Sequence, residues 1–199
     1  MSAVLLRHDK VTLALHPLRG AGDGRALLLL HGRGERSPAS VPAALAPWPG
    51  SIFALDFTGH GASTLPSGGG YTAEILMADA DAALAHLGAA TLVGRGLGAY
   101  VAMLLAGGGP RPVTPSIAAP AEAGAGPPDP HALIELARDV RPPDYATSFV
   151  RQACQLSGLE RPLSVCAVER PDWLAAVVEE PGAECTTLGE ALAHYASAT

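Results

Sequence analysis

Residues that could do chemistry follow three apolar runs of this sequence. The runs, each with the segment that follows it, are Leu27–Leu30 with His31 and Gly32, Ser51–Leu55 with Asp56–Ser63, and Thr91–Val93 with Gly94–Gly98. An imidazole can accept or donate a proton near neutral pH. The backbone N–H groups of a glycine-rich turn at the start of a helix bind anions and oxygen atoms that gain negative charge in a reaction. If the fold brings the three segments together, they predict a site for a small anion or a polarised carbonyl group.

A parallel sheet would position these segments, and the rest of the chain predicts one. We expect strands at residues 3–6, 11–15, 27–30, 51–55, 91–93, 113–118, 163–168 and 183–187, and helices at residues 72–87, 99–106, 131–140, 145–156, 172–178 and 190–196. Apolar strands that alternate with helices are typical of an α/β fold, with a mostly parallel sheet and helices on both faces. The first two strands read as an antiparallel hairpin. Ligands of such sheets bind at the carboxyl ends of the strands, where the three segments lie.

Composition excludes several classes of function. With 13 Lys and Arg against 19 Asp and Glu, the 199 residues carry a formal charge of −6, which argues against a nucleic-acid partner or an anionic membrane. The hydrophobic content of 48% predicts one folded domain over residues 1–199, and the absence of a long apolar run or signal-peptide pattern favours a cytoplasmic protein. Cys154, Cys166 and Cys185 lack metal-ligand spacing, so the sequence predicts no metal and no cofactor, only a small-molecule partner. The oligomeric state stays open.

Three motifs in this order resemble those of the alpha/beta hydrolase family. They are Leu27–Gly32, similar to the family's strand and oxyanion loop, Asp56–Ser63, similar to its Asp-x-x-Gly-His-Gly-x-Ser loop, and Gly94–Gly98, at the place of its nucleophile elbow. The resemblance covers nearly the whole chain and implies the α/β-hydrolase fold. Because the chain is short for the family, the resemblance also implies a cap domain reduced to a loop region at residues 120–140, and a wide, partly open pocket.

The chain departs from the family at the positions of the catalytic residues. The family's elbow has a serine at the position of Gly96; glycine adopts the strained turn readily but carries no nucleophile. The family's histidine is missing after the last expected strand, residues 183–187, and we expect His194, inside the final helix, to be a surface or packing residue. Only the acid of the triad has candidates, Asp172 or Glu169. The resemblance therefore implies a degenerate Ser-His-Asp triad.

The backbone of an oxyanion hole does not depend on the missing serine. By the resemblance, its N–H groups belong to Arg33 and Leu97. The ligand-binding residues that this implies are Gly32, Arg33, Arg95, Gly96 and Leu97. Three arginines on loops at this edge of the sheet suggest a small anionic ligand: Arg33, Arg36 and Arg95. The alternative is that they are surface residues paired with Glu35 or other acids.

Two histidines near the expected pocket could replace the missing base. They are His31 and His60, and each belongs to a motif that shapes a loop in the family, which favours a structural role for both. Asp56, Thr58 and Ser63 are likewise expected to brace their loop.

Three functions remain open from the sequence. The favoured one is a protein that binds a small anionic or carbonyl-containing ligand without serine-esterase activity. The second is an active hydrolase or lyase in which His31, His60 or an activated water acts at the oxyanion pocket. The third is a dinucleotide-binding protein, because Gly94-x-Gly96-x-x-Ala99 also matches that fingerprint, although the usual acidic residue about twenty positions later is absent.

Overall fold

The computed structural model describes residues 2–32, 34–66, 73–108, 114–119, 163–165, 183–185 and 188–197. Several features expected from the sequence lie outside these residues. They are the helices at 131–140, 145–156 and 172–178, the reduced cap at 120–140, Cys154 and Cys166, and the candidate site residues Arg33, Glu169 and Asp172.

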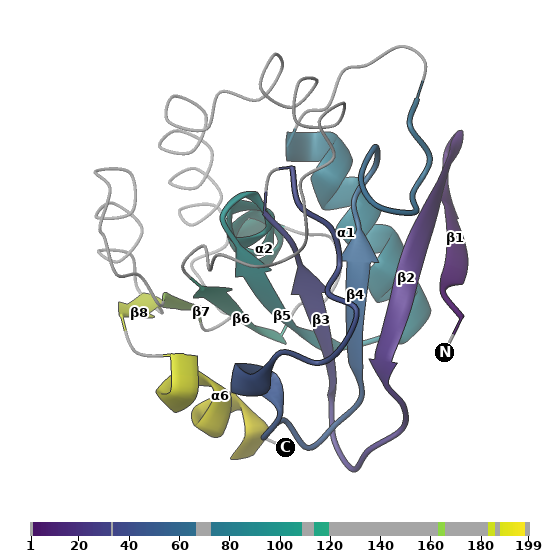
Figure 1. The fold of residues 1–199 in the computed structure, drawn as a ribbon. Coiled ribbons are helices and arrows are strands. Elements are labelled where there is room, and N and C mark those ends of the chain that lie inside the picture. Colours follow the sequence, from purple (N-terminus) through teal and green to yellow (C-terminus); the bar gives the residue numbers. More distant parts are fainter. Residues whose placement is uncertain are drawn as a thin grey trace.

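The described residues form one sheet of eight strands (Figure 1). In chain order the strands are β1 (Val4–His8), β2 (Val11–Arg19), β3 (Ala26–Leu30), β4 (Ile52–Asp56), β5 (Ala90–Arg95), β6 (Thr114–Ala119), β7 (Leu163–Val165) and β8 (Ala183–Cys185). Their order across the sheet is β1-β2-β4-β3-β5-β6-β7-β8. β1 and β2 pair antiparallel, β2 pairs antiparallel with β4, and all the other pairs are parallel. This arrangement confirms the predicted mostly parallel sheet with an antiparallel N-terminal hairpin.

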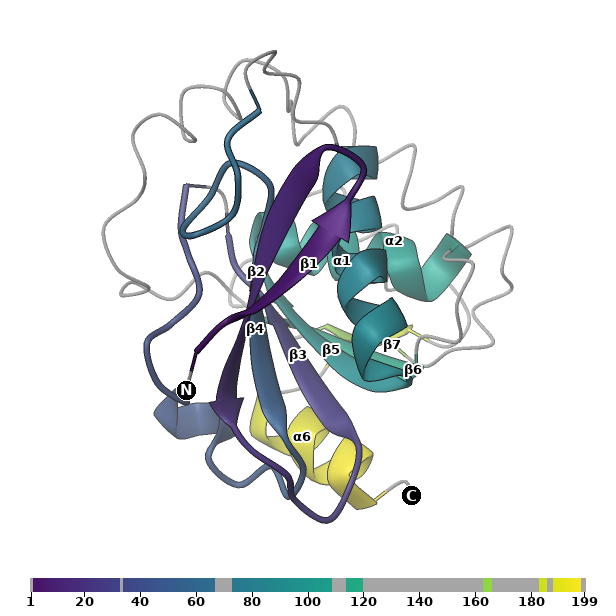
Figure 2. The ribbon, with the colours of Figure 1, turned by 90° about the vertical axis from the view of Figure 1, so that its right-hand side faces the viewer.

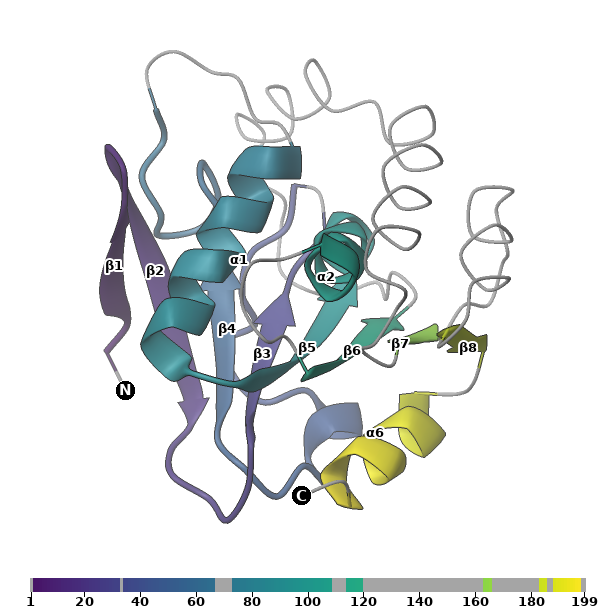
Figure 3. The same ribbon diagram turned by 180° about the vertical axis from the view of Figure 1, so that it is seen from behind.

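Helices cover both faces of the sheet, as predicted. The helices α1 (Ala73–Leu87) and α2 (Leu97–Gly108) cover one face (Figure 3), and α6 (Leu188–Ser197) with the short 3-10 helix η1 (Ala43–Leu45) covers the other (Figure 1). Figure 2 shows the twisted sheet from the side of β1 and β2. Within the described part of the chain, no helix is long and apolar enough to span a membrane.

The all-leucine run of β3 explains why both faces need a cover. Successive side chains of a strand point to opposite faces, so a strand buried on both sides is apolar throughout. Leu28 and Leu30 join the core cluster that contains α1 and α2 residues, and Leu27 and Leu29 join the cluster under α6. Because all four leucines are buried, β3 is fixed near the centre of the sheet, where its carboxyl end can take part in a site.

One predicted boundary was wrong by four residues, and several others were wrong by two. The sequence predicts that the second strand ends at Leu15. In the structure β2 continues to Arg19, because it pairs with β4 beyond the end of β1. Pro17 lies past Leu15, the last residue of β2 that pairs with β1, so on that side its missing N–H breaks no ladder bond. The helix predicted to end at residue 106 extends to Gly108. η1 was not predicted.

Candidate functional site

The turn between β5 and α2, Gly94–Gly98, has the shape of an elbow. At its tip Gly96 has φ +53°, in the left-handed region that strains every residue except glycine. A Cβ on Gly96 would nevertheless lie in ordinary contact, 3.6 Å from the Cα of Gly32, its nearest neighbour. The tip is exposed. The described residues would therefore leave space for a side chain here, and the sequence provides none.

Packing, in contrast, requires glycine at the base of the elbow. A Cβ on Gly98 would overlap the carbonyl group of Leu30 and lie 2.6 Å from the carbonyl oxygen of His31. This close approach places the start of α2 against the carboxyl end of β3. The last residue of β3, Leu30, pairs there with Gly94 of β5. The N–H groups in the first turn of α2, beginning with Leu97, have no acceptor within the helix. Gly32, Gly96 and Leu97, expected at one site from the sequence, are therefore brought together.

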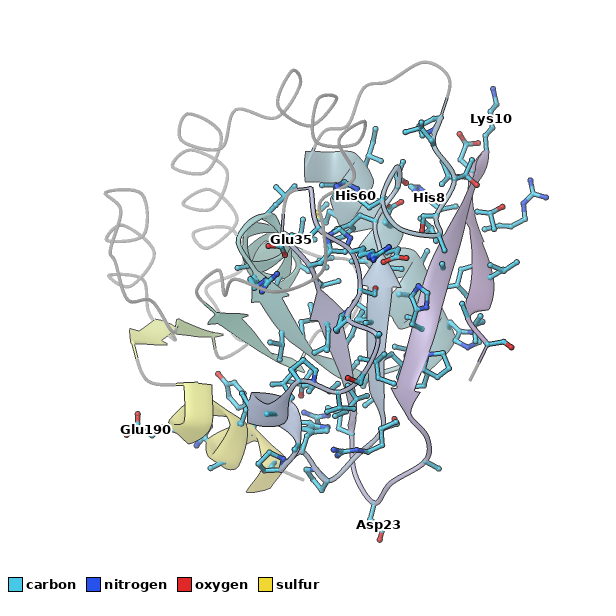
Figure 4. All side chains as sticks on the ribbon, viewed as in Figure 1. His8, Lys10, Asp23, Glu35, His60 and Glu190 are labelled. Atoms are coloured by element: carbon cyan, nitrogen blue, oxygen red, sulfur yellow. The ribbon has the colours of Figure 1, made fainter. Side chains whose placement is uncertain are left out.

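A carboxylate lies beside the elbow. Glu35 Oε2 accepts a hydrogen bond of 2.8 Å from the N–H of Gly32, and a Cβ on Gly32 would lie 2.8 Å from that oxygen. Arg95, the last residue of β5, donates to the same oxygen from Nε at 3.0 Å, and its terminal nitrogen Nη2 forms an ion pair with that oxygen. Figure 4 shows Glu35 above the carboxyl ends of β3 and β5. The positive charge of Arg95 is thus balanced by Glu35, the alternative that the sequence left open.

His31 has both ring nitrogens bonded to the backbone. The N–H of Phe57 donates to Nε2 at 3.1 Å, so Nδ1 carries the proton and donates to the carbonyl of Gly32 at 2.8 Å. Burial, with a smaller contribution from His60, lowers the pKa of His31 to about 3. His31 is therefore neutral at physiological pH, and its nitrogens join the loop after β3 to the loop after β4.

His60 lies next to His31, with ring centroids 4.8 Å apart. It is buried, and its Nδ1 donates to the carbonyl of Thr58 at 2.9 Å (Figure 4). Thr58 in turn donates its N–H and its hydroxyl to the carboxylate of Asp79 on α1, at 2.8 and 2.9 Å. Burial raises the pKa of Asp79. These contacts attach the loop after β4 to α1.

Ser63 is also occupied within the structure. Its hydroxyl donates to the carbonyl of Asp56 at 2.6 Å and accepts the N–H of Ala14 at 2.9 Å. A hydroxyl that both donates and accepts in a buried position is poorly placed to attack a substrate.

The remaining candidates lie away from the elbow or outside the described residues. His194 is exposed on α6, where its ring packs against Tyr195, and α6 covers the sheet face opposite α2. Arg36 is exposed and lines a cleft where β2, the end of β4 and the segment after β3 meet. Among the described residues, no group of three His, Cys, Asp or Glu side chains could hold a metal ion.

Sequence reasoning missed the roles of Asp79 under the loop after β4 and of His16, which contacts Asp56. It named Glu35 as an alternative partner of the arginines but missed its bond to Gly32. Asp79 could have been found, because its carboxylate interrupts the apolar helix face formed by Leu76, Ala80 and Ala83. Glu35 and His16 give no such signal, since their partners are distant in the sequence or are backbone groups.

Comparisons with known proteins agree with this geometry. Residues 27–198 match the profile of a family described as the alpha/beta hydrolase family. A hypothetical protein from Pseudomonas aeruginosa PAO1 has a similar structure, with 20% identity and a TM-score of 0.67 over 100% of this chain and 99% of that one. The thioesterase domain of the curacin biosynthetic pathway is 18% identical, with a TM-score of 0.62 over 100% and 98% of the two chains. The bottromycin epimerase BotH, in complex with bottromycin A2, is also 18% identical, with a TM-score of 0.60 over 100% and 96%. No curated protein sequence is significantly similar to this chain.

Proposed function

This chain belongs to the alpha/beta hydrolase family, and we propose that it binds a small neutral carbonyl compound at the elbow without using a serine nucleophile. The observation that carries the proposal is Gly96 itself. The turn has the conformation that presents a nucleophile in the family, with room for a side chain, and the residue there has none.

The backbone supports binding of a carbonyl oxygen. The N–H groups at the start of α2 point out of the helix end, and the helix dipole adds partial positive charge there. A carbonyl oxygen placed over Gly96 would accept from the N–H of Leu97. Arg33, the second donor implied by the family resemblance, lies outside the described residues.

Charge at the elbow favours a neutral ligand over an anion. The guanidinium of Arg95 is already paired with Glu35, whose carboxylate also accepts the N–H of Gly32. An incoming carboxylate would have to displace Glu35 or lie close to it, and like charges at short range repel. A ketone, amide, ester or lactone meets no such cost.

Catalysis by the family's usual mechanism needs a base as well as a nucleophile. His31 is neutral, with both nitrogens bonded to the backbone, and Nδ1 of His60 is bonded to Thr58. Activities other than hydrolysis also occur on this fold, as the epimerase among the similar structures illustrates. Since the family accounts for Gly94–Gly98 as an elbow, no separate feature supports a dinucleotide site.

Titration with neutral and anionic ligands tests the proposal. We expect binding heat with γ-butyrolactone or N-methylacetamide and weaker binding with acetate, and no release of product from the lactone. If acetate binds more tightly than the neutral compounds, the ligand class is wrong. If none of these compounds or a wider set of esters and ketones gives heat with folded protein, the binding function itself is wrong.

One observation favours a second candidate, an active hydrolase with unusual residues. Glu35 Oε2 receives two hydrogen bonds and an ion-pair contact, whereas Oε1 makes no hydrogen bond to a described residue and could accept a proton from a water that attacks a carbonyl over Gly96. A screen of activated esters, thioesters and lactones decides between the candidates. Turnover that Glu35→Gln abolishes, and that the same change at the exposed Glu190 leaves intact, would establish this alternative.

A further inference from the structure

A cleft of about 760 Å³ lies where β2, the end of β4 and the segment after β3 meet. None of the described residues that line it belongs to the elbow, Gly94–Gly98. Its walls combine the polar side chains of His16, Arg36 and Asp56 with small nonpolar surfaces such as those of Pro38 and Pro42. The cleft is therefore a separate concave surface with polar groups at defined positions, the usual form of a small-molecule site.

Asp56 is the fixed point of this cleft. Its carboxylate accepts hydrogen bonds from the N–H of Ser37 at 2.7 Å, the N–H of Ala62 at 2.8 Å and the ring of His16 at 2.9 Å. Burial by itself would raise the pKa of Asp56, but these bonds lower it below the ordinary value. A Cβ on Gly61 would lie 2.6 Å from Oδ1, so glycine is needed there to admit the carboxylate.

The hydrogen bond to Asp56 determines which ring nitrogen of His16 is left to bind a ligand in the cleft. Because the carboxylate is ionised, Nε2 of His16 carries a proton and donates it to Oδ2. Nδ1 makes no hydrogen bond to any residue that the structure describes. The His16 side chain is 30% exposed, against 3% for Asp56. A ring held at one nitrogen by an anchored carboxylate can offer its other nitrogen to a ligand.

We propose that the cleft binds a small hydroxycarboxylate, whose hydroxyl donates to Nδ1 of His16 and whose carboxylate pairs with the exposed guanidinium of Arg36. The two side chains need different partners, a hydrogen-bond donor for Nδ1 of His16 and an anion for the guanidinium of Arg36, and one short molecule with a hydroxyl and a carboxylate supplies both. Pro38 and Pro42 offer nonpolar surface for the carbon chain between the two ends.

The experiment follows the His16 ring by NMR at pH 7 during titration with 3-hydroxybutyrate. The His16 signal is identified as the one that His16→Gln removes. Butyrate, which lacks the hydroxyl, and 2-butanol, which lacks the carboxylate, are titrated in parallel. We expect a saturable shift with 3-hydroxybutyrate, with a half-saturation concentration of about 1–10 mM, as expected for a ligand of this size. Each of the other two compounds should need at least about fivefold more.

Two arginine variants, followed by the same His16 signal, test the contact between the ligand carboxylate and Arg36. Arg36 is exposed, so Arg36→Gln is expected to fold, and it should raise the half-saturation concentration at least about fivefold. Arg7→Gln, the same change at an exposed position on β1 outside the cleft, should leave it unchanged. The proposal is overturned if wild-type protein shows no saturable shift up to about 100 mM, if the three compounds bind equally, or if the two arginine variants behave alike.

Discussion

Glycine-to-alanine changes at the starts of two helices measure how much the close packing of α2 against β3 requires glycine at the elbow. Gly98 is the second residue of α2 and Gly189 is the second residue of α6, and a leucine precedes each. A Cβ on Gly189 would meet no described residue within 4 Å, whereas on Gly98 it would lie 2.6 Å from the carbonyl oxygen of His31. The two variants therefore make the same chemical change at matched positions, with and without a neighbouring backbone.

The expected magnitudes follow from these distances. For Gly98→Ala, α2 and β3 must separate by roughly 0.8 Å to clear the carbonyl of His31 and by more to clear the nearer carbonyl of Leu30. A clash of this size with backbone atoms places the cost at the upper end of the usual range for overpacking, about 3 kcal/mol or more. Alanine returns up to about 1 kcal/mol through helix propensity, so the net loss in unfolding free energy is about 2 kcal/mol or more. Gly189→Ala should gain up to about 1 kcal/mol. Gly96→Ala has room for its Cβ and should lose only about 1–2 kcal/mol, the cost of the left-handed backbone.

Urea unfolding followed by tryptophan fluorescence measures these differences, and thermal unfolding gives an independent check. For a chain of this length, a loss of 2 kcal/mol lowers Tm by about 4–8 °C. The reasoning fails if Gly98→Ala is no more destabilising than Gly189→Ala, because the start of α2 would then not be packed against the end of β3 as described.

Three further predictions concern the site and its supporting loops. Gly96→Ser should give no esterase activity beyond that of the wild type, because His31 and His60 are bonded to the backbone and are not placed to deprotonate the new hydroxyl; robust turnover in an ester assay would show that a base is present. His31 binds no proton in the folded state between about pH 3 and its unfolded pKa near 6.5, so unfolding free energy should fall as pH drops through this window by up to several kcal/mol. His31→Asn should remove that part of the pH dependence in urea titrations, and the same change at the exposed His86 should not. Asp56→Asn should cost about 2 kcal/mol or more at pH 7 and less toward pH 3, since the lowered pKa stabilises the fold above the unfolded value and this contribution is lost on acidification; an equal loss at both pH values would contradict it.

Local sequence patterns predicted most of the fold because the strands here are short and apolar. β3 and β4 are largely buried in the sheet. A polar residue marks the end of each, His31 directly after β3 and Asp56 as the last residue of β4. Boundaries that depend on pairing were less predictable. β2 extends to Arg19 only because β4 lies beside it, and no local pattern near Pro17 reports that neighbour.

The candidate site was predicted at the level of loops and less well at the level of side chains. Gly32 was expected beside Gly96 and Leu97 because the parallel strands β3 and β5 end at one edge of the sheet. The partner of Arg95 depends on where Glu35 lies after the chain turns back over Gly32, and the bond between His16 and Asp56 joins residues 40 positions apart. Such contacts are set by tertiary packing and have no periodicity in the sequence.

Intact-protein mass spectrometry after exposure to a fluorophosphonate tests the absence of a nucleophile most directly. The reagent phosphonylates activated serine side chains, so a protein with glycine at the tip of its elbow should retain its unmodified mass. A single stoichiometric adduct on the folded protein, not formed when the protein is unfolded before exposure, would show that a reactive side chain reaches the site. That result would contradict the account.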